Sequence, residues 1–390
     1  MLICNSTELK DICHFISGGT PSRKVPEYFS GTIPWITGAD INENVITKAR
    51  DYITEGAIRN SATKIVPQGS ILLVTRTGVG KVAIAGTDIC ISQDLTGLEL
   101  DYNKVINWYL FYFLLSQQSL LTDQQRGATI QGITRDIVEN LCLPLPPLPE
   151  QQRIAAILQK ADRLRRLRRY ARQLSDGYLQ SVFLEMFGDP ATNSKGWKKG
   201  YIDDVISTSQ YGTSTKSNNE QKGFPILGMA NITFSGQLVL SSIAYVELSE
   251  DEFQSLKLEK GDIIFNRTNS TELVGKTALW DVDQEAVLAS YLIKLKVNQK
   301  VTSNFLCALM NTQFYKRLFR DRCKKAIGQS NVSPTLLREF PVIIPPINLQ
   351  KEFSDKVTLS KKLFRIQGES ERQTEMLFQS LLQKAFQGEL

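Results

Sequence analysis

Two short polar segments with cationic and amide side chains recur at matching places in the chain. RGATIQ (Arg126–Gln131) and KKAIGQ (Lys324–Gln329) both precede a proline-rich stretch. Lysine and arginine reach phosphate groups, arginine also pairs with guanine, and glutamine or asparagine can pair with adenine. Ordinary loop polarity is the alternative for each residue taken singly, but the recurrence favours a binding role. Similar residues on or beside predicted loops are Arg76, Lys81, Arg135, Arg267, Lys276, Arg317, Arg320, Arg322, Ser330 and Asn331.

Segments that resemble nucleotide-binding motifs lack the neighbouring residues that those motifs need, and catalytic motifs are not found. GVGKVA (Gly78–Ala83) fits a loose dinucleotide fingerprint, but β-branched residues follow it where that motif needs a helix. VGKT (Val274–Thr277) has Ser270 where a P-loop needs glycine. The single histidine, His14, and the six isolated cysteines argue against triads, zinc sites and disulfide frameworks. We find no amino-methyltransferase, nuclease or metal-binding motif, and therefore expect a non-catalytic chain without a metal or cofactor of its own.

The composition is that of a globular protein that could bind an acidic partner. Hydrophobic residues make up 42% of the chain and charged residues 22%, and the formal net charge is +6. Such a charge permits a nucleic-acid partner without requiring one. No apolar run is as long as a membrane span, and the first residues lack the features of a signal peptide. We therefore expect a cytoplasmic protein without membrane contact.

An internal repeat organises the chain into two similar halves. IPWITGADI parallels FPILGMANI, QGSILL parallels KGDIIF, VGKVAI parallels VGKTAL, and KVINWYLFYFLLSQ parallels KVTSNFLCALMNTQ. Each half then ends at a proline junction, LPLPPLPEQQRIAAIL or VIIPPINLQKEFSDKV. Matches in one order indicate a duplicated unit, which we expect to be a mixed α+β domain followed by a long helix. Within the domains, Ile71–Thr75 and Val82–Ala85 are predicted strands, and Tyr109–Leu121 and Phe305–Phe319 carry helix-spaced apolar residues.

The segments after the proline junctions have the pattern of long helices. Ile154, Ile157, Ala161, Leu164, Leu167, Ala171, Leu174, Tyr178 and Val182 recur at spacings of three and four. Each helix would be about 57 Å long at 1.5 Å per residue. We expect the two helices to bury these apolar residues by antiparallel pairing, with Arg165 near Glu371 and the neighbouring arginines near Glu369, Glu371 or Glu375. The run RLRRLRRYAR (Arg163–Arg172) could instead form a solvated face or contact an acidic partner or DNA.

These features resemble the specificity subunit of type I restriction–modification enzymes over nearly the whole chain. The resemblance rests on GGTPS (Gly18–Ser22), IPWITGADI (Ile33–Ile41), the segment Gly69–Lys81 and the junction Pro144–Leu158 with its long helix. The second half departs from the pattern, because Asn348–Gln350 replaces the expected proline–glutamine motif and an extended loop precedes its GKT.

The resemblance implies an α+β fold with two target-recognition domains and two long antiparallel helices related by a pseudo-two-fold repeat. Domain 1 would cover residues 1–145, the central helix 146–188, domain 2 residues 189–344 and the C-terminal helix 345–390. Each domain would read one half of a bipartite, asymmetric site in double-stranded DNA. The helices would set the gap and dock two modification subunits, which use S-adenosylmethionine to methylate adenine. Two restriction subunits, which use ATP and Mg, would join the complex.

The residues that we assign to these roles fall into two groups. The DNA-binding candidates are Thr20, Ser22, Thr37, Arg76, Lys81, Thr129, Gln131, Arg135, Thr213, Asn231, Arg267, Lys276, Gln329, Ser330 and Asn331. The candidates for the spacer helices and partner docking are Pro146, Pro147, Gln151, Arg165, Arg169, Pro345, Pro346, Gln350 and Glu371. Two alternatives stay open at this point. The chain could be the DNA-recognition scaffold of a related restriction or methylation system, or a helical scaffold protein that does not bind DNA.

Overall fold

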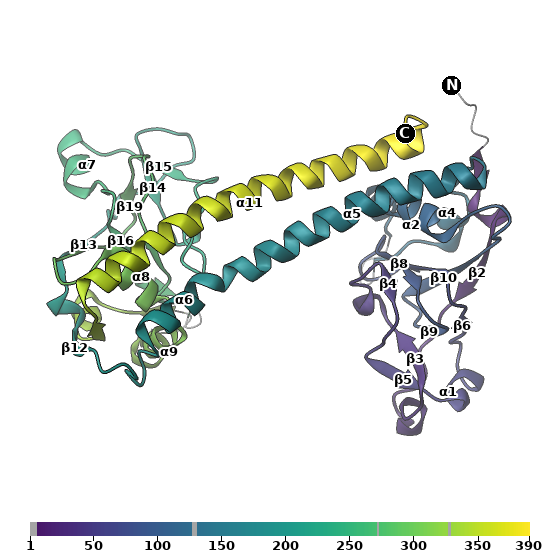
Figure 1. The fold of residues 1–390 in the computed structure, drawn as a ribbon, viewed down its shortest axis with the longest axis horizontal. Helices are drawn as coiled ribbons and strands as arrows, with labels where there is room; N and C mark the ends of the chain where they lie inside the picture. The colour runs from purple at the N-terminus through teal and green to yellow at the C-terminus, as the bar shows by residue number, and fades with distance from the viewer. Residues whose placement is uncertain (1–5, 127–130, 271–272, 327–328) are drawn as a thin grey trace. The chain divides into compact units, whose positions relative to one another are not determined.

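The chain forms two compact units in a computed structural model that describes residues 6–126, 131–270, 273–326 and 329–390. Unit 1 consists of Met1–Tyr170 and Glu369–Leu390, and unit 2 consists of Ala171–Gly368. Each unit thus combines one globular region with part of both long helices, α5 (Leu148–Asp176) and α11 (Ile347–Gln387) (Figure 1). The domain boundaries at residues 145, 188 and 344 stay a prediction.

Unit 1 is built on a five-stranded sheet and a second, four-stranded sheet. The first has the order β2 (Cys13–Ser17), β10 (Leu95–Leu100), β7 (Ile71–Val74), β8 (Val82–Ala85) and β4 (Val45–Ile46). The second has the order β5 (Asp51–Ile53), β3 (Ile33–Ile36), β9 (Ile89–Ile91) and β6 (Ile65–Val66), with β3 and β9 parallel. Strands β7 and β8 are buried throughout, which confirms the two strands predicted from their β-branched runs. Shorter elements are β1 (Ser6–Glu8), η1 (Leu9–Asp11), η2 (Pro26–Phe29), η3 (Gly38–Asp40), α1 (Glu55–Arg59), α3 (Gln118–Asp123), α4 (Arg135–Glu139) and β11 (Cys142–Pro144).

Unit 2 repeats this architecture, which confirms the duplication inferred from the sequence. Its four-stranded sheet has the order β13 (Ile206–Tyr211), β20 (Leu292–Val297), β16 (Ile263–Asn266) and β18 (Thr277–Leu279). Its counterpart of the second sheet has the order β15 (Ala244–Val246), β14 (Phe224–Leu227) and β19 (Val287–Leu288), with β14 and β19 parallel. A further small sheet joins β17 (Thr268–Asn269), β22 (Gln329–Asn331) and β21 (Lys324–Ala326). The other elements are β12 (Lys198–Tyr201), η4 (Ile202–Asp204), η5 (Met229–Asn231), α7 (Glu250–Leu256), α10 (Pro334–Arg338) and β23 (Pro341–Ile344).

A buried helix packs on the main sheet in each unit. In unit 1 it is α2 (Asn107–Ser116), whose residues Tyr109–Leu114 are all buried. Such a helix is apolar on every side because the sheet, the long helices and the rest of the core surround it. In unit 2 the corresponding helix is α8 (Ser303–Met310). The helix-spaced pattern of the sequence covers two helices in each unit, because α3 follows α2 and α9 (Gln313–Arg322) follows α8.

The long helices run antiparallel within each unit, as predicted. In unit 1, Arg153 donates to the backbone oxygen of Leu390 (2.6 Å) and Arg165 donates to Glu375 (2.9 Å). In unit 2, Phe187 of α6 (Tyr178–Phe187) contacts Phe353 with ring centroids 5.4 Å apart. A Cβ atom placed on Gly368 would lie 3.9 Å from Nη1 of Arg172. In both units the residue numbers rise along one helix as they fall along the other.

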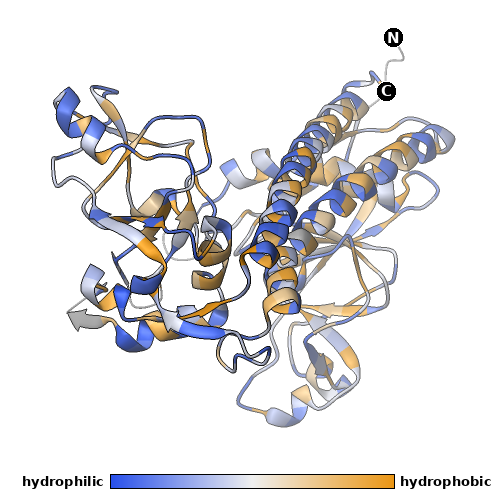
Figure 2. Ribbon diagram, turned by 60° about the vertical axis from the view of Figure 1, so that its left-hand side comes forward, coloured by the Kyte–Doolittle hydropathy of each residue, from blue (hydrophilic) through white to orange (hydrophobic). Residues whose placement is uncertain are grey.

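The expected continuous apolar seam between the helices is wrong for the middle of the first helix. Its ends are buried against the domains, since Ile154 is 5% exposed in unit 1 and Val182 is 8% exposed in unit 2. Leu164, Leu167 and Leu174 are instead 42%, 54% and 62% exposed. The same spacing thus serves domain packing at the helix ends and leaves apolar side chains on the surface between them. Hydrophobic and hydrophilic residues accordingly alternate along both long helices (Figure 2).

No described helix has the length and apolar character needed to cross a membrane.

Candidate nucleic-acid interface

Three loops of unit 1 emerge at the same edge of the five-stranded sheet. Ser17, the last residue of β2, lies opposite Thr96, and Val74, the last residue of β7, lies opposite Leu95. The loop after β2, the loop after β7 and the loop before β10 therefore meet. Backbone contacts confirm this, because Asp94 O accepts hydrogen bonds from the N–H groups of Thr75 (2.8 Å) and Arg76 (3.2 Å).

The loop between β7 and β8 presents two exposed cations at this edge. Thr77, Gly78 and Gly80 have φ angles of 51°, 103° and 87°, so the loop needs glycine at two of these three positions. The GVGK motif is therefore a tight turn between two strands and not a nucleotide-binding loop. Arg76 and Lys81 are exposed and form no ion pair with any other described residue. Both side chains can therefore reach an anionic partner.

The recurrent polar segment of unit 1 lies beside this loop. Gly132 forms bridge pairs with both Arg76 and Arg126, and the N–H of Thr77 donates to Gln131 O (3.3 Å). The structure thus brings Arg76 next to Arg126 and Gln131, which lie about fifty residues later in the sequence, and all three residues are exposed. We call Arg76, Lys81, Arg126 and Gln131 the first edge. Thr129 lies outside the described residues.

Unit 2 has an equivalent edge with different side chains. Tyr211, at the end of β13, lies opposite Ile293, and Arg267 follows the last residue of β16 and donates its N–H to Tyr291 O (3.1 Å). The guanidinium of Arg267 stacks on the ring of Tyr211 at 4.9 Å, while Tyr211 and Tyr291 are 44% and 47% exposed. The N–H of Val332 donates to Arg267 O (2.9 Å), so the segment before the proline junction is again adjacent. We call Tyr211, Arg267, Tyr291 and Asn331 the second edge.

Three buried polar atoms at or next to the second edge find no hydrogen-bond partner among the described residues. They are Nδ2 of Asn266, Nε of Arg267 and Oδ1 of Asn331. An unsatisfied buried polar group costs about 1–3 kcal/mol. All three atoms are shielded from solvent, so a ligand can contact them only if the surrounding side chains move.

Several of the predicted DNA-binding residues shape the edges through contacts with the protein itself. Thr37 donates to Oδ2 of Asp40 (2.8 Å). Asn231, 5% exposed, donates to the backbone oxygens of Val239 (2.8 Å) and Ser242 (3.1 Å). Lys276 donates to the backbone oxygens of Met229 (3.3 Å) and Ile232 (3.0 Å), and burial lowers the pKa of its amine.

The remaining candidates differ in their access to solvent. Arg135 is exposed but forms an ion pair with Glu139 (2.5 Å), four residues later on the same helix. Thr20 and Ser22 are exposed after β2, Thr213 is half-buried, and Ser330 is fully buried. The side chain of Gln329 lies outside the described residues. Arg135 and Ser330 are therefore weaker candidates for contact with a ligand than Arg76 or Arg267.

Two glutamines at the proline junctions lock each long helix onto its domain. Gln151 is fully buried. Its amide nitrogen, Nε2, donates to the backbone oxygens of Lys104 (2.8 Å) and Pro146 (2.9 Å), and its Oε1 accepts from the N–H of Ile106 (3.1 Å). Gln350 is also fully buried and repeats all three bonds with Lys300 O (3.2 Å), Pro345 O (2.8 Å) and Thr302 N–H (2.9 Å). Their predicted role in partner docking therefore becomes an internal one. Pro147 and Pro346 are exposed, whereas Pro146 is half-buried and Pro345 is buried.

The arginine run makes a specific contact in unit 1. Arg165 bonds Asp162 (2.7 Å) and Glu375 (2.9 Å), and its guanidinium lies 3.9 Å from the centre of the Phe378 ring. Arg169 also approaches Glu375, at 3.6 Å. The expected pairing of Arg165 with Glu371 is thus shifted by one helical turn to Glu375. The alternative of interhelical pairing therefore holds for Arg165, which is half-buried.

Sequence reasoning missed two sets of exposed residues. The first is the pair Tyr211 and Tyr291, whose position beside Arg267 follows only from the strand register. The second set consists of large apolar side chains on the long helices. In unit 1 these are Leu164, Leu167, Tyr170, Met376 and Leu377, and in unit 2 they are Leu174, Tyr178, Leu359, Leu363 and Ile366. Among the described residues, no group of three or more His, Cys, Asp or Glu could hold a metal ion.

Comparisons with known proteins identify the family of this chain. The family model described as type I restriction modification DNA specificity domain matches residues 4–172 and 194–371. The MjaVIII specificity subunit of Methanocaldococcus jannaschii is 24% identical over 97% of this chain and 91% of its own length. The MjaIX specificity subunit from the same organism is 25% identical over 68% of this chain, and that match spans about two thirds, 66%, of the relative. The EcoR124I/EcoR124II specificity subunit of Escherichia coli is 31% identical over 40% of each chain.

Solved structures agree on the fold. The S subunit of a type I restriction–modification system from M. genitalium superposes with a TM-score of 0.57 at 19% identity, over 99% of this chain and 97% of that one. A chain from a study of complex assembly and conformational transition of the type I restriction–modification system has a TM-score of 0.60 at 18% identity, over 99% and 98%. With both repeats matched by the family model, the chain belongs to the specificity subunits of type I restriction–modification enzymes.

Proposed function

We propose that this chain is the non-catalytic subunit that reads a bipartite, asymmetric DNA site for a type I restriction–modification complex. Each unit would read one half-site through its own edge. The two edges occupy equivalent places in the repeat but carry different side chains, Arg76, Lys81 and Gln131 against Tyr211, Arg267 and Asn331. One scaffold with two different reading surfaces is what an asymmetric site requires.

The observation that carries this proposal is the set of exposed side chains at equivalent edges of the two main sheets. Arg76 and Lys81 are exposed at the first edge. At the second edge the guanidinium of Arg267 stacks on Tyr211, beside the exposed Tyr291. Long cationic side chains reach phosphate groups, and arginine can also read guanine in the major groove.

The long helices supply the surfaces for partner subunits in this proposal. Within each unit, leucine, isoleucine and methionine side chains of these helices stay exposed to solvent. We propose that two modification subunits cover them, since exposing apolar surface costs about 25 cal/mol per Å². S-adenosylmethionine would be bound by those subunits, and ATP and Mg²⁺ by two restriction subunits, and not by this chain.

Alanine substitutions at one residue of each edge test the proposal. We would measure binding of Arg76→Ala and Arg267→Ala, each assembled with the modification subunit, to DNA that carries the recognised site, across a range of salt concentrations. If the arginine contacts phosphate, its removal should lower the salt dependence of the binding constant by about one unit of slope. If it reads guanine, its removal should cost about 1–3 kcal/mol of binding free energy at one base pair.

Lysines at the opposite ends of the main sheets provide matched controls. Lys10, which pairs with Glu8, precedes β2, and Lys300 follows β20. Both are exposed, so Lys10→Ala and Lys300→Ala each remove one positive charge away from the edges. Affinities of Arg76→Ala and Arg267→Ala equal to those of the controls would exclude the two edges as the DNA interface. Sequencing methylated adenines in the host with and without the gene would then identify the site, or show none.

A further inference from the structure

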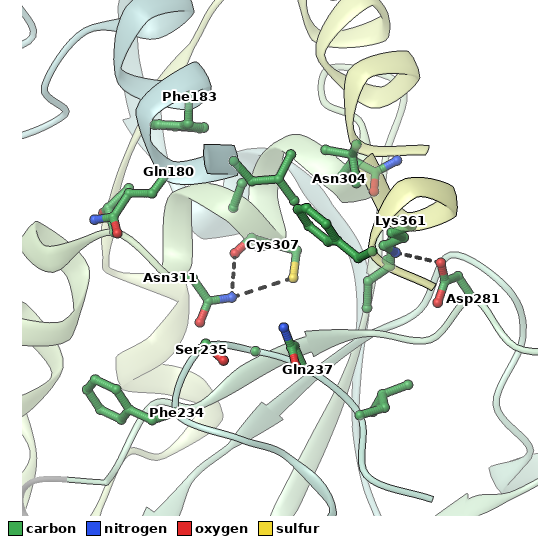
Figure 3. A pocket seen from close by; sticks show the side chains of 18 of the residues that line it. Gln180, Phe183, Phe234, Ser235, Gln237, Asp281, Asn304, Cys307, Asn311 and Lys361 are labelled. Atoms are coloured by element: carbon green, nitrogen blue, oxygen red, sulfur yellow. Dashed lines mark hydrogen bonds and ion pairs between the residues drawn. The ribbon is translucent and has the colours of Figure 1, made fainter. Parts of the chain in front are cut away.

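Unit 2 contains a cavity of about 800 Å³ between the long helices and the recognition domain. Helices α6, α8 and α11 and the loop 234–238 surround it (Figure 3). Phe183, Phe353, Val357 and Leu279 supply apolar walls, and Asn311 adds an amide. The volume lies in the range of small-molecule sites, and half of the residues that line the cavity are polar or charged.

The internal repeat gives the position in unit 1 that corresponds to each cavity residue. The hydrogen bonds of the two junction glutamines align α2 with α8 without a gap. Gln151 bonds to Lys104 and Ile106, and Gln350 bonds in the same way to Lys300 and Thr302. In this register Trp108, Phe111 and Tyr112 of unit 1 correspond to Asn304, Cys307 and Ala308 of unit 2. Counted from the same glutamines, Phe378 of unit 1 corresponds to Leu179. Asn304, Cys307, Ala308 and Leu179 all line the cavity.

In unit 1 the equivalent space is filled by aromatic rings. Tyr112 lies with its ring centroid 5.0 Å from that of Phe111, 6.0 Å from that of Trp108 and 6.2 Å from that of Phe378. The guanidinium of Arg165 covers Phe378 at 3.9 Å. The second half of the chain has lost these rings at four positions while keeping the backbone frame, so the cavity has room for an aromatic ring.

Several polar groups of the cavity are already occupied by contacts within the protein. Nδ2 of Asn311 donates to the backbone oxygens of Thr277 (2.8 Å) and Cys307 (3.0 Å), and its Oδ1 is buried too completely for a bound molecule to contact it. Nζ of Lys316, also a cavity residue, is placed 5.0 Å from the ring centre of Phe234, so a cation already faces aromatic groups here. A neighbouring cation, Lys361, is paired with Asp281 (2.5 Å).

From this geometry we infer that the cavity binds a planar aromatic small molecule. The ring takes the place of the side chains that fill unit 1. Apolar cavities of smaller size are known to take up benzene, which shows that ring burial alone can drive such binding. Because the walls come from both the domain and the helices of unit 2, the bound molecule would strengthen the attachment between them.

Indole is the probe that tests this inference, with 1-methylindole as a second aromatic compound of similar size. We would titrate both into the full chain by calorimetry and follow thermal unfolding. Indole should bind once per chain with a Kd of roughly 10 µM to 1 mM, and 1-methylindole should bind with a similar affinity. Binding to the native state should raise the Tm as the indole concentration rises.

Variants that restore the aromatic residues of unit 1 provide the decisive control. Ala308→Tyr and Cys307→Phe should each fill the cavity, abolish indole binding and leave the circular dichroism spectrum unchanged. Conversely, Tyr112→Ala should open the equivalent space in unit 1 and raise the stoichiometry from one indole to two. The inference is overturned if wild-type protein does not bind indole up to millimolar concentrations, or if both filled variants fold and still bind it. It is equally overturned if neither filled variant folds, because the space would then not exist.

Discussion

Removing the amide of Gln151 should loosen unit 1 alone. In Gln151→Ala the backbone oxygens of Lys104 and Pro146 and the N–H of Ile106 lose their partner, and all three bonds are within 3.1 Å. Unsatisfied buried groups cost about 1–3 kcal/mol each. Water can reach the half-buried junction at Pro146, so we take the lower end of that range and expect a loss of about 3–4 kcal/mol in the free energy of unfolding.

Hydrogen exchange followed by mass spectrometry localises this loss. The amides at the start of α2, beginning with Ile106, should exchange faster in Gln151→Ala, while those at the start of α8 should be unchanged. Gln350→Ala should show the reverse pattern, because Gln350 holds Thr302 in the same way. Gln152→Ala is the matched control, since Gln152 is the exposed neighbour on the same helix, and its stability should stay within about 0.5 kcal/mol of wild type. Equal stability and exchange in Gln151→Ala and Gln152→Ala would refute the lock.

Three further perturbations have defined outcomes. Burial alone would raise the pKa of Glu375, but Gln379, Arg165 and Arg169 outweigh burial and lower that pKa. The ionised Glu375 therefore contributes its full stabilisation above the unfolded-state pKa of about 4.3 and loses it as the pH falls through the lower folded-state pKa. Arg165→Ala should flatten the pH dependence of the urea-measured stability between about pH 5 and pH 3, and an unchanged pH profile would count against the pair. Leu167→Glu, at a 54% exposed position, should leave the Tm unchanged and weaken co-purification with the modification subunit, whereas undiminished co-purification would remove that helix face from the docking surface. Exchanging residues 18–141 for the matching segment of a relative should change one half-site in methylation mapping, and loss of both half-sites would contradict the modular arrangement.

The repeat, the strands β7 and β8, the long helices and the family could all be inferred from the sequence. Each depends on local chemistry, because β-branched runs, helix-spaced apolar residues and proline junctions act through neighbours in the chain. The antiparallel direction of the helices also followed from the duplication, although the apolar stripe that was expected to be buried between them is exposed in the middle of the first helix. The GVGK turn was correctly separated from a nucleotide-binding loop, because the residues after it favour a strand.

Residue roles depended on long-range contacts and could not be read from residue type. Gln151 and Gln350 look like surface polar residues of a helix, yet both are fully buried. Lys276 carries the charge expected of a phosphate contact, but its amine is taken up by two backbone oxygens that lie more than forty residues earlier. Arg76 and Arg126 become neighbours only because Gly132 pairs with both.

The sequence by itself determined the duplicated α+β unit, the rigid helical exits and the supply of cationic and amide side chains. The tertiary structure alone decided which of those side chains are exposed, that the helix ends and not their middles are buried, and that unit 2 has a partly open cavity where aromatic rings pack in unit 1. The physical reason is that exposure and cavity formation depend on which surfaces meet. The same spacing of leucines suits a contact with the chain's own domain and a contact with a partner subunit equally well. Ala308 stands in unit 2 where unit 1 has Tyr112, and whether the smaller side chain leaves a cavity depends on the residues that pack against it.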